Sequence, residues 1–400
     1  MAIPPVVALE IGTTKVLALV GEIREDGHIM VTGIGEQPSA GVRKGEVIDL
    51  ENAVTCVRSV LATAEETGKV SIRQVHLAIS GGHIQTVVSR GMIPVRSKNR
   101  EIGESDVSQV KEVARSVNLP ADREIIHSIC QHFCIDDQEQ VLRPEGMEGA
   151  KLSLDMLVLH GIRGRMHNIA KVVRSVPMGV QDVAFSGLCS ALSVLTPEQK
   201  KSGVIVIDLG GGTTDYVAYA DDVLAVAGAL GIGGDHITND IAMAFNIPTS
   251  QAESVKREHG SAMVEPGSAS KNVDVPPEVG FPGRSICLKS LQMVVNARTD
   301  EMLGMIRRRI EKDDLLHHIG AGVVLTGGGA NMKGITRLAE KMFGLPCSVG
   351  RPRNISGMAV ATSGPEYATC SGLIQLGFKM MAEQSQHRSM GDWFKQLFWK

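Results

Sequence analysis

Aromatic side chains are scarce in this chain: they make up 3% of its 400 residues, and only two of them are tryptophans. Paired cysteine motifs are also missing, because the seven cysteines are scattered and no Cys-x-x-Cys occurs. An odd, scattered set of cysteines argues against a disulfide framework and suits a reducing compartment. We therefore expect the protein in the cytoplasm.

A large net charge and long apolar runs are missing as well. The net charge is −3 with no evident basic face, which argues against a nucleic-acid partner. No apolar segment approaches the ~20 residues that span a bilayer. The start, MAIPPVVALEIG, lacks the basic residues and cleavage site of a signal peptide. A composition of 43% hydrophobic and 21% charged residues predicts a globular chain of two or more domains.

One cluster of potential metal ligands, HSICQHFC, contains His127, Cys130, His132 and Cys134. As a strand it would alternate its side chains between two faces. One face would then hold Ser128, Cys130, His132 and Cys134, and the other Ile129, Gln131, Phe133 and Ile135. Zinc sites usually show tighter, paired ligand spacings. We favour the strand over a metal site.

Two stretches, VVALEIGTTKVLALVGEI and GVIVIDLGGGTTDYVAYA, each predict a strand, a tight turn and a second strand. Glycine-rich hairpin turns can direct backbone N–H groups at a phosphate, and Thr hydroxyls and Lys15 add donors. Carboxylates stand at the strand ends: Glu10 in the first stretch, Asp208 and Asp215 in the second. They fit a hydrated Mg²⁺ bound to the phosphates. The pattern predicts a phosphate site unlike a P-loop, whose GxxxxGK[ST] signature is missing.

Two further glycine-rich stretches precede predicted helices. VVLTGGGANMKGITRLAEKMFGLP predicts a strand that ends in glycines, with a helix starting nearby. GIGGDHITNDIAMAF predicts a helix with Ile237, Ile241 and Phe245 on one face. In the following AESVKREHG, Glu253 and Lys256 lie three residues apart on a helix, so both can reach one ligand. Taken alone, that pair is more simply interpreted as a solvated surface ion pair.

In order and spacing, LEIGTTK, IDLGGGTTD and LTGGGANMKGI resemble the two phosphate loops and the adenosine loop of the actin/Hsp70/sugar-kinase superfamily. The AExxK helix resembles the ribose- and adenine-contacting segment of the bacterial actins. The resemblance implies an α/β, actin-like fold of two duplicated ribonuclease-H-like domains, with ATP and Mg²⁺ between them.

The resemblance also implies roles for individual residues. The phosphate cradle would consist of Gly12, Thr13, Thr14, Lys15, Gly210, Gly211, Gly212, Thr213 and Thr214. The nucleoside would be enclosed by Gly234, Glu253, Lys256, Gly327, Gly328, Gly329 and Asn331. The catalytic group would be Glu10, Asp208 and Asp215. Glu10 and Asp208 would hold Mg²⁺ through water, and Asp215 would assist there or orient the attacking water.

The chain departs from the superfamily pattern at two places. Glu10 stands where the superfamily usually has Asp, and QDVAFSGLCSALSVL offers no Gln or Glu clearly aligned with the residue that positions the lytic water. We therefore expect a weak, slow ATPase in which the nucleotide acts mainly as an assembly switch.

Several stretches resemble the bacterial cell-division FtsA family, among them GVRKGEVIDLENAV, SVLTPEQKKSGVIVIDLGGGTTDY and PRNISGM. That family also carries Glu in its first phosphate loop. The resemblance implies subdomain 1A at 1–82 plus 164–199, an inserted subdomain 1C at 83–163, and subdomain 2A at 200–230 plus 311–383. It implies subdomain 2B at 231–310 and a linker with a C-terminal helix at 384–400. The last helices of 311–383 could pack back on 1A.

Within 1C, Ser105 or Asp106 could cap a helix with Val107, Val110, Ala114 and Val117 along one side.

The resemblance implies several partners. Subdomain 2B would receive the C-terminal tail of the tubulin-like FtsZ, and Arg284, Lys289 and Arg298 are its candidate contacts. Each of these cations is otherwise simply solvated. The family further implies actin-like filaments, contacts with other division proteins, and anchoring of FtsZ filaments on the cytoplasmic side of the inner membrane.

The end of the chain, GDWFKQLFWK, contains both tryptophans. On a helix, Trp393, Phe394, Leu397 and Phe398 form one apolar arc flanked by lysines, while Trp399 joins it only if the last turn frays. We expect this peripheral helix to bind anionic lipid weakly as a single copy and firmly as many copies on one filament. The alternative is that the helix docks on the protein's own surface.

Three other functions remain as alternatives. A sugar kinase would need a base carboxylate beside a sugar pocket, and a chaperone would need a peptide-binding domain after the ATPase. Neither is found in the sequence. The actin-like platform protein of type IV pilus assembly shares the 1C arrangement, and the amphipathic C-terminal end argues against it.

Overall fold

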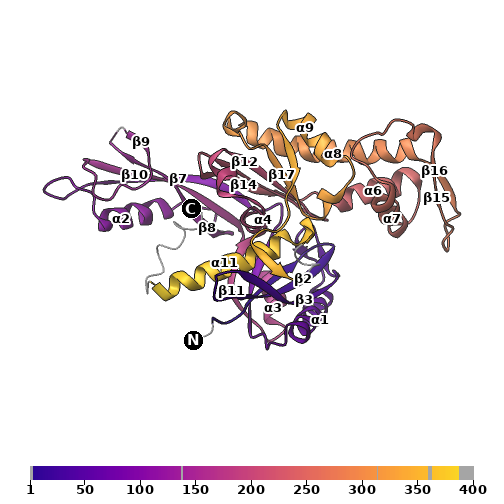
Figure 1. The fold of residues 1–400 in the computed structure, drawn as a ribbon, viewed down its shortest axis with the longest axis horizontal. Helices are drawn as coiled ribbons and strands as arrows, with labels where there is room; N and C mark the ends of the chain where they lie inside the picture. Colours follow the sequence, from indigo (N-terminus) through magenta and orange to yellow (C-terminus); the bar gives the residue numbers. More distant parts are fainter. Residues whose placement is uncertain (1–2, 137, 313, 359–362, 387–400) are drawn as a thin grey trace.

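The computed structural model describes residues 3–136, 138–312, 314–358 and 363–386. A central body carries two arms that point in opposite directions, one formed by the insertion after β6 and one by the segment around α6 to α8 (Figure 1). The membrane-helix residues Trp393, Phe394, Leu397, Phe398 and Trp399 lie outside the described residues.

The first domain is built on a six-stranded sheet with the order β11-β6-β1-β2-β3-β19. Its strands are β1 (Val6–Ile11), β2 (Lys15–Ile23), β3 (Ile29–Pro38), β6 (Gln74–Ile79), β11 (Gly179–Phe185) and β19 (Ile355–Gly357). β1, β2 and β3 pair antiparallel, and the other pairs are parallel. The helices that pack on this sheet are α1 (Leu50–Gly68), α3 (Arg163–Arg174), α4 (Ser186–Val194) and α11 (Ala368–Gln386). The short strands β4 (Val42–Arg43) and β5 (Glu46–Val47) form a separate pair.

A glycine in β3 lets helix α1 approach the sheet closely. A Cβ atom built on Gly35 would lie 1.9 Å from the Val60 carbonyl oxygen of α1. Only the absence of a side chain permits this contact between backbones.

The second domain repeats the first on a five-stranded sheet with the order β14-β13-β12-β17-β18. Its strands are β12 (Val204–Leu209), β13 (Thr214–Ala220), β14 (Val223–Leu230), β17 (Val323–Thr326) and β18 (Cys347–Val349). Smaller elements complete it: α5 (Pro197–Lys201), η2 (Leu315–His318), η3 (Gly328–Asn331) and α9 (Ile335–Phe343). The hairpin of β12 and β13 corresponds to that of β1 and β2, and each turns through glycine and threonine residues. The two predicted strand-turn-strand units are therefore confirmed.

The insertion between β6 and α3 is a four-stranded sheet with the order β7-β10-β8-β9 and one helix. Its elements are β7 (Gln85–Pro94), α2 (Glu104–Arg115), β8 (Arg123–Ile135), β9 (Gln138–Val141) and β10 (Lys151–Ile162). It has an apolar core of its own, to which α2 contributes Val107, Val110 and Ala114. Helix α2 begins one residue earlier than Ser105, with Gly103 as its N-cap, so the predicted cap is wrong. Asp106 instead accepts the Gly103 N–H, since its carboxylate reaches back from the third helical position.

The cysteine-histidine cluster lies on β8, where a register shift opposite Asp155 and Met156 breaks the simple alternation. Cys130 consequently packs in the same core as Phe133 and Ile135, which the sequence had placed on the other face. The expected two-face division is therefore wrong, because a β-bulge inserts one extra residue and moves what precedes it to the opposite side. Among the described residues, no group of three or more His, Cys, Asp or Glu side chains is arranged to hold a metal ion.

The second arm consists of α6 (Gly234–Phe245), α7 (Thr249–His259), η1 (Ser268–Ser270), the hairpin β15 (Asn272–Val275) and β16 (Arg284–Cys287), and the first half of α8 (Leu288–Lys312). As predicted, α6 buries Ile237 and Ile241 and packs Phe245 against the same core. From residue 355 the chain returns to the first domain, where β19 pairs with β3. η4 (Pro365–Tyr367) then leads into α11, which packs on α4 and β1. The exact subdomain boundaries stay predictions.

In the part of the chain that the structure describes, no helix is both long and apolar enough to cross a membrane.

Candidate functional site

A cleft of about 870 Å³ opens where both hairpin turns, the α6–α7 pair and the β17 turn come together. Ligand pockets for small molecules typically measure about 300 to 1,000 Å³. The predicted site residues in its lining are Glu10, Gly12, Thr13, Thr14, Lys15, Asp208, Gly210, Gly211, Gly212, Thr213, Gly234, Glu253, Lys256, Gly327, Gly328, Gly329 and Asn331. Stretches more than 300 residues apart in sequence therefore share one cavity.

The two hairpin turns have the same geometry and face each other. The Gly12 N–H donates to the Lys15 carbonyl and the Gly210 N–H to the Thr213 carbonyl, both over 3.0 Å. A Cβ on Gly211 would lie 1.9 Å from the Thr14 hydroxyl oxygen. Because glycine has no side chain, the two turns can approach this closely and expose backbone to a ligand.

Thr214 is the one predicted cradle residue that does not line the cleft. It is fully buried, and its hydroxyl donates to the Ile232 carbonyl over 2.8 Å. That bond connects β13 to the loop before α6. Within the structure, Thr214 thus holds the second turn against its neighbouring loop.

Behind the turns, Glu10, Asp208 and Asp215 surround a smaller cavity of about 40 Å³. The pKa of Glu10 is raised to about 7, mainly by burial and further by the negative charge of the nearby Asp208. Burial also raises the pKa of Asp208, and it raises the pKa of Asp215 well above its ordinary value with help from Asp208. Three carboxyl groups crowded in a buried site disfavour ionisation, so this cluster favours a cation close by.

Hydroxyl groups from the first domain and from α11 hold the two aspartates of the second domain. Ser190 and Thr369 both donate to Asp208, the latter over 3.1 Å, while Ser80 donates to Asp215. None of these three hydroxyls was predicted from the sequence. Ser80 stands in a Ser-Gly-Gly stretch that resembles the other glycine-rich turns, and this is the signal that could have found it. Ser190 and Thr369 carry no such signal.

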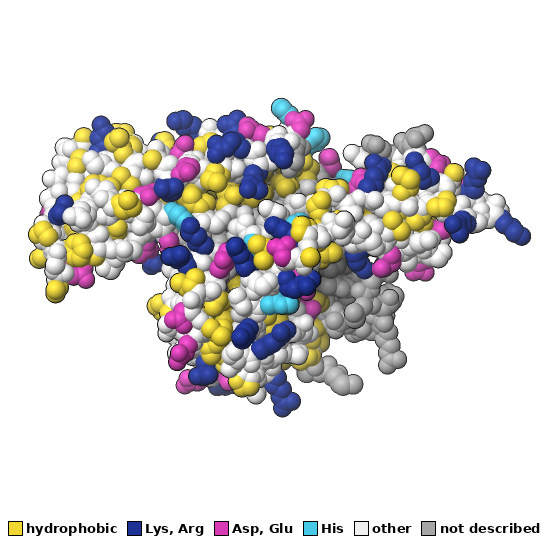
Figure 2. All heavy atoms as spheres, turned by 180° about the vertical axis from the view of Figure 1, so that it is seen from behind, with side chains coloured by type: hydrophobic (Ala, Val, Ile, Leu, Met, Phe, Trp, Pro, Cys, Tyr) yellow, Lys and Arg dark blue, Asp and Glu magenta, His cyan; other side chains and the backbone are white. Residues whose placement is uncertain are grey.

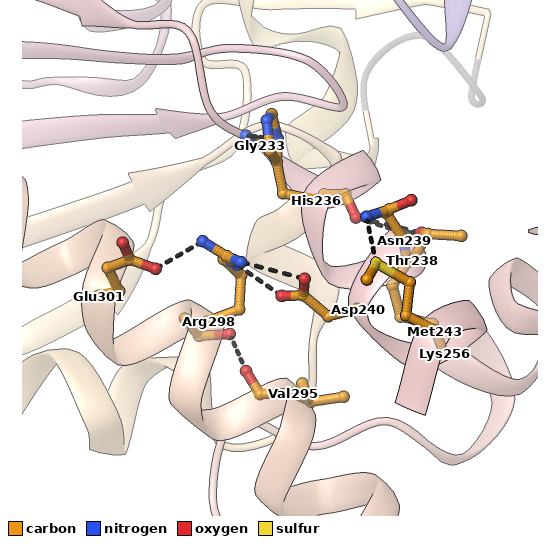
Figure 3. Close-up of polar contacts among 12 residues, drawn as sticks. Gly233, His236, Thr238, Asn239, Asp240, Met243, Lys256, Val295, Arg298 and Glu301 are labelled. Carbon is orange, nitrogen blue, oxygen red and sulfur yellow. Dashed lines mark hydrogen bonds and ion pairs between the residues drawn. The ribbon is translucent and has the colours of Figure 1, made fainter. Parts of the chain in front are cut away.

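Helices α6 and α7 form another wall of the cleft, close to the contacts drawn in Figure 3. Lys256 donates to the Gly234 carbonyl over 3.1 Å and to the Thr238 hydroxyl over 2.8 Å, and it lies 2.6 Å from Glu253. Burial alone would raise the pKa of Glu253, but the hydrogen bonds from Lys256 and Thr238 lower it to about 2. Because the Lys256 side chain is only 11% exposed, its ion pair with Glu253 forms part of the cleft wall and is not a solvated surface pair.

The start of α6 is fixed to the second turn. The N–H groups of Gly234 and Asp235 donate to the carbonyls of Gly210 and Gly211 over 2.9 and 2.8 Å. Asp235 also lines the cleft, and burial raises its pKa. Asp235 was not predicted as a site residue, because an acidic residue in the first turn of a helix is common.

The predicted partner residues lie outside the cleft lining. Arg284 lies exposed on β16, and Lys289 lies in the first turn of α8. Arg298 forms a two-pronged contact with Asp240, over 2.6 and 3.0 Å, and a second ion pair with Glu301 (Figure 3). Any acidic partner would therefore compete with Asp240 for Arg298.

The residues present fit a nucleotide polyphosphate with its cation. Two apposed glycine turns expose backbone groups, and Lys15 stands beside them in the lining of the same cavity. Glu10 and Asp208 both line the cleft and offer carboxyl oxygens, the kind of donor that Mg²⁺ prefers. Mg²⁺ usually keeps several of its water ligands, so these carboxyl groups can bind it through water without ligating the ion directly.

Comparison with known proteins bears on this arrangement. The family model described as "Cell division protein FtsA" matches residues 205–372, and "SHS2 domain inserted in FTSA" matches residues 81–160. The chain is 35% identical over 378 residues to the Cell division protein FtsA of Pseudomonas aeruginosa, which covers 94% of this chain and 90% of that one.

Two solved structures share the architecture. The PilM-PilN type IV pilus biogenesis complex matches with a TM-score of 0.64 at 16% identity, covering 93% of this chain and 98% of that chain. MreB5 of Spiroplasma citri bound to ADP matches with a TM-score of 0.55 at 14% identity, covering 96% and 99%.

The duplicated sheets, the cleft between the hairpins and these two structures define an actin-like protein. The expected class, a two-domain α/β actin-like fold with the FtsA-type insertion, is confirmed. The chain belongs to the FtsA family of cell division proteins.

Proposed function

We propose that this protein binds ATP with Mg²⁺ in the cleft and uses the nucleotide as an assembly switch. The observation that carries the proposal is the pair of apposed glycine-threonine turns with three buried carboxyl groups behind them. The ADP bound to MreB5 of Spiroplasma citri supports it, since that protein shares the fold.

Individual roles follow from the placement of each residue. The first and second turns, with Lys15, would cradle the phosphates through backbone and side-chain donors. Glu10 and Asp208 would hold the Mg²⁺ through water. The nucleoside would be enclosed by the Glu253–Lys256 ion pair, the glycines after β17 and Asn331.

We further propose that hydrolysis is slow. The segment before the second turn forms β11 and α4, and it contributes Ser186 and Ser190 near the carboxylates instead of a Gln or Glu. A serine hydroxyl is a weak base. Asp215 would therefore be the group that orients the attacking water. Because its raised pKa favours the protonated form, it would accept a proton from that water poorly.

Membership in a cell division family supports actin-like filaments that anchor FtsZ and recruit later division proteins. The C-terminal tail of FtsZ would dock on the α6–α8 arm. Exposed apolar side chains occur there, including Met243 at 74% and Val279 at 98% exposure, with Arg284 and Lys289 as candidate cations. Figure 2 shows apolar side chains among few charged ones at that end of the molecule, on the left.

Membrane attachment rests on the sequence GDWFKQLFWK, which follows α11 at the end of the chain. We propose that it binds anionic lipid on the cytoplasmic face of the inner membrane at the division site. A single short helix must fold as it binds and so holds weakly. Many copies on one filament hold firmly, because each later attachment is intramolecular.

Calorimetric titration tests the nucleotide site directly. The parent should bind ATP, more tightly with Mg²⁺ than with a chelator present. A protein that binds no ATP under either condition would refute the proposal.

Anionic liposomes test the membrane role separately, since both tryptophans lie in the tail. A saturable blue shift of their emission supports membrane binding, and a blue emission that lipid does not change means docking on the protein itself.

A further inference from the structure

Five consecutive residues, 365–369, run along the cleft, which Glu366, Tyr367 and Thr369 line, and they contact both domains. We call this segment the strap; it consists of η4 and the first two residues of α11. The Pro365 carbonyl accepts the Gly327 N–H and the Thr326 hydroxyl, both over 3.1 Å. Through these bonds the strap is fixed to the end of β17 in the second domain.

Three side chains of the strap reach predicted ligand residues. Glu366 accepts from the Asn331 amide over 3.0 Å, and Thr369 donates to Asp208 over 3.1 Å. Tyr367 reaches the first domain: its ring lies 4.0 Å below the Lys15 ammonium, and its hydroxyl donates to Glu36 over 2.9 Å. The strap thus contacts at least one candidate residue of each kind: Asn331 for the nucleoside, Asp208 for the metal and Lys15 for the phosphates.

Lys15 is shared between two partners. Its ammonium lies 3.4 Å from Glu36 and over the Tyr367 ring, and its side chain is 22% exposed. The Glu36 carboxylate neutralises the charge that a phosphate group would otherwise use. The Tyr367 hydroxyl donates to Oε2 of this carboxylate, whose Oε1 faces Lys15, and so draws negative charge away from the oxygen beside Lys15. Burial and Glu36 raise the pKa of Tyr367, so its hydroxyl remains a donor.

The strap continues directly into α11, which is packed tightly. A Cβ on Gly372 would lie 1.8 Å from the Cys189 carbonyl oxygen of α4, and Cys370 contacts Glu10 and the Leu17 carbonyl. Because α11 is held this closely, we expect a shift at its first turn to be transmitted along the helix. The same helix leads to the C-terminal tail in sequence.

We propose that the strap senses nucleotide phosphates: the Tyr367 hydroxyl weakens the hold of Glu36 on Lys15 by binding its second carboxylate oxygen, and phosphate binding at Lys15 shifts the first turn of α11. This inference rests on the proposed nucleotide site and adds the residues that regulate it. The phosphate must displace Glu36 from Lys15, which leaves the Tyr367–Glu36 bond to rearrange. Because the strap begins α11, the change reaches the helix that precedes the tail.

The first experiment compares two substitutions that should change the affinity for Mg·ATP in opposite directions. Tyr367→Phe keeps the ring and removes the hydroxyl, so Glu36 holds Lys15 more fully and affinity for Mg·ATP should fall about five- to tenfold. Glu36→Gln removes the competing charge, so affinity for Mg·ATP should rise by a similar factor. Affinity for adenosine, which has no phosphate, should stay unchanged in both. Glu66→Gln, an exposed carboxylate on α1, is the control for a general change in charge.

A double-mutant cycle tests whether Tyr367 acts through Lys15. In a Lys15→Met background, Tyr367→Phe should change the affinity for Mg·ATP no further. If both single substitutions weaken ATP, or if adenosine weakens equally, the residues have a merely structural role and the inference is wrong. If the parent binds no ATP at all, the proposed function itself fails.

Hydrogen exchange of the full chain tests the link to α11. Saturating Mg·ATP should change the exchange of backbone amides in 365–375 of the parent, and adenosine should not. In Tyr367→Phe at saturating Mg·ATP the change should be reduced. An identical change in parent and variant, or none in the ATP-saturated parent, would show that the strap does not relay the phosphate signal.

Discussion

Ser80 of the first domain donates a hydrogen bond to Asp215 of the second, across the boundary between the two sheets. Ser80 follows β6, immediately before the inserted subdomain, and Asp215 lies on β13 opposite Asp208. The bond therefore joins the proposed catalytic group to the point where the insertion leaves the first domain. A change in the angle between the domains would alter both at once.

Replacing Ser80 with alanine should shift the pH dependence of ATP hydrolysis. The hydroxyl favours the ionised form of Asp215, so its loss raises the pKa of Asp215 further. The acid limb of the profile should move to higher pH, and turnover at neutral pH should fall several-fold, about 1 kcal/mol in the barrier. ATP affinity should change less than twofold.

Ser153→Ala is the control for Ser80→Ala. Ser153 is also buried, in the inserted subdomain, and its hydroxyl has no hydrogen-bond partner among the residues that the structure describes. Its substitution should leave the pH profile in place. An unmoved profile in Ser80→Ala would mean that Asp215 is not the group that controls turnover.

Glu10 should make the nucleotide-free protein less stable as the pH rises. Its pKa is about 7 in the folded protein against 4.5 ordinarily, so the folded state binds the proton more tightly. Stability is then lost progressively between pH ~4.5 and ~7, by about 3 kcal/mol at most. Glu10→Gln removes this loss, so its gain in melting temperature over the parent should grow from pH 5 to pH 8.

The buried histidines act in the opposite direction but cancel in this comparison. Burial lowers the pKa of His76, His83 and His127 to about 4, so all three destabilise the fold as the pH falls below 6.5. They are present in both proteins. A difference between Glu10→Gln and the parent that stays constant with pH would contradict the assignment, and Mg·ATP should flatten the parent's dependence.

Glycine-rich turns and strand-end carboxylates were predictable from sequence because each is a local pattern. At these turns a Cβ atom would collide with neighbouring atoms, which is why glycine recurs there, and buried apolar runs mark the strands beside them. The roles of Ser190 and Thr369 were not predictable, since each meets Asp208 only after distant segments fold together. The bulge in β8 was equally hidden, because an extra residue leaves no mark in a nearly continuous buried run.

Gly327→Ala should strongly destabilise the protein. Gly327 has φ +78°, and a Cβ there would lie 2.2 Å from an Asp208 carboxylate oxygen. We expect a loss of about 2 to 5 kcal/mol in the free energy of unfolding, from backbone strain plus the collision. Gly344→Ala separates the two causes, because Gly344 has φ +69° and open space around it. It should cost only about 1 kcal/mol. Chemical denaturation measures both, and equal losses would exclude the collision.

The inserted subdomain is held to the second domain by side chains that bind the backbone of β14, an edge strand. Gln131 donates to the Leu224 carbonyl over 2.8 Å in a buried position, and Thr86 donates to the Ala227 carbonyl over 3.0 Å. Gln131→Leu would leave the Leu224 carbonyl buried without its partner, which costs about 1 to 3 kcal/mol. Hydrogen exchange in β14 and β8 should therefore accelerate, while α1 in the first domain keeps its protection.

Gln109→Leu is the matched control for this docking contact, because Gln109 lies exposed on α2 of the same subdomain. It should leave exchange in β14 unchanged. Unfolding of the whole chain in Gln131→Leu, with equal loss of protection in α1, would mean that Gln131 supports the global fold. A loss confined to β14 and β8 would mean that the inserted subdomain can detach from the second domain on its own. The bond from Gln131 to β14 would then be what fixes the orientation of the inserted subdomain relative to the second domain.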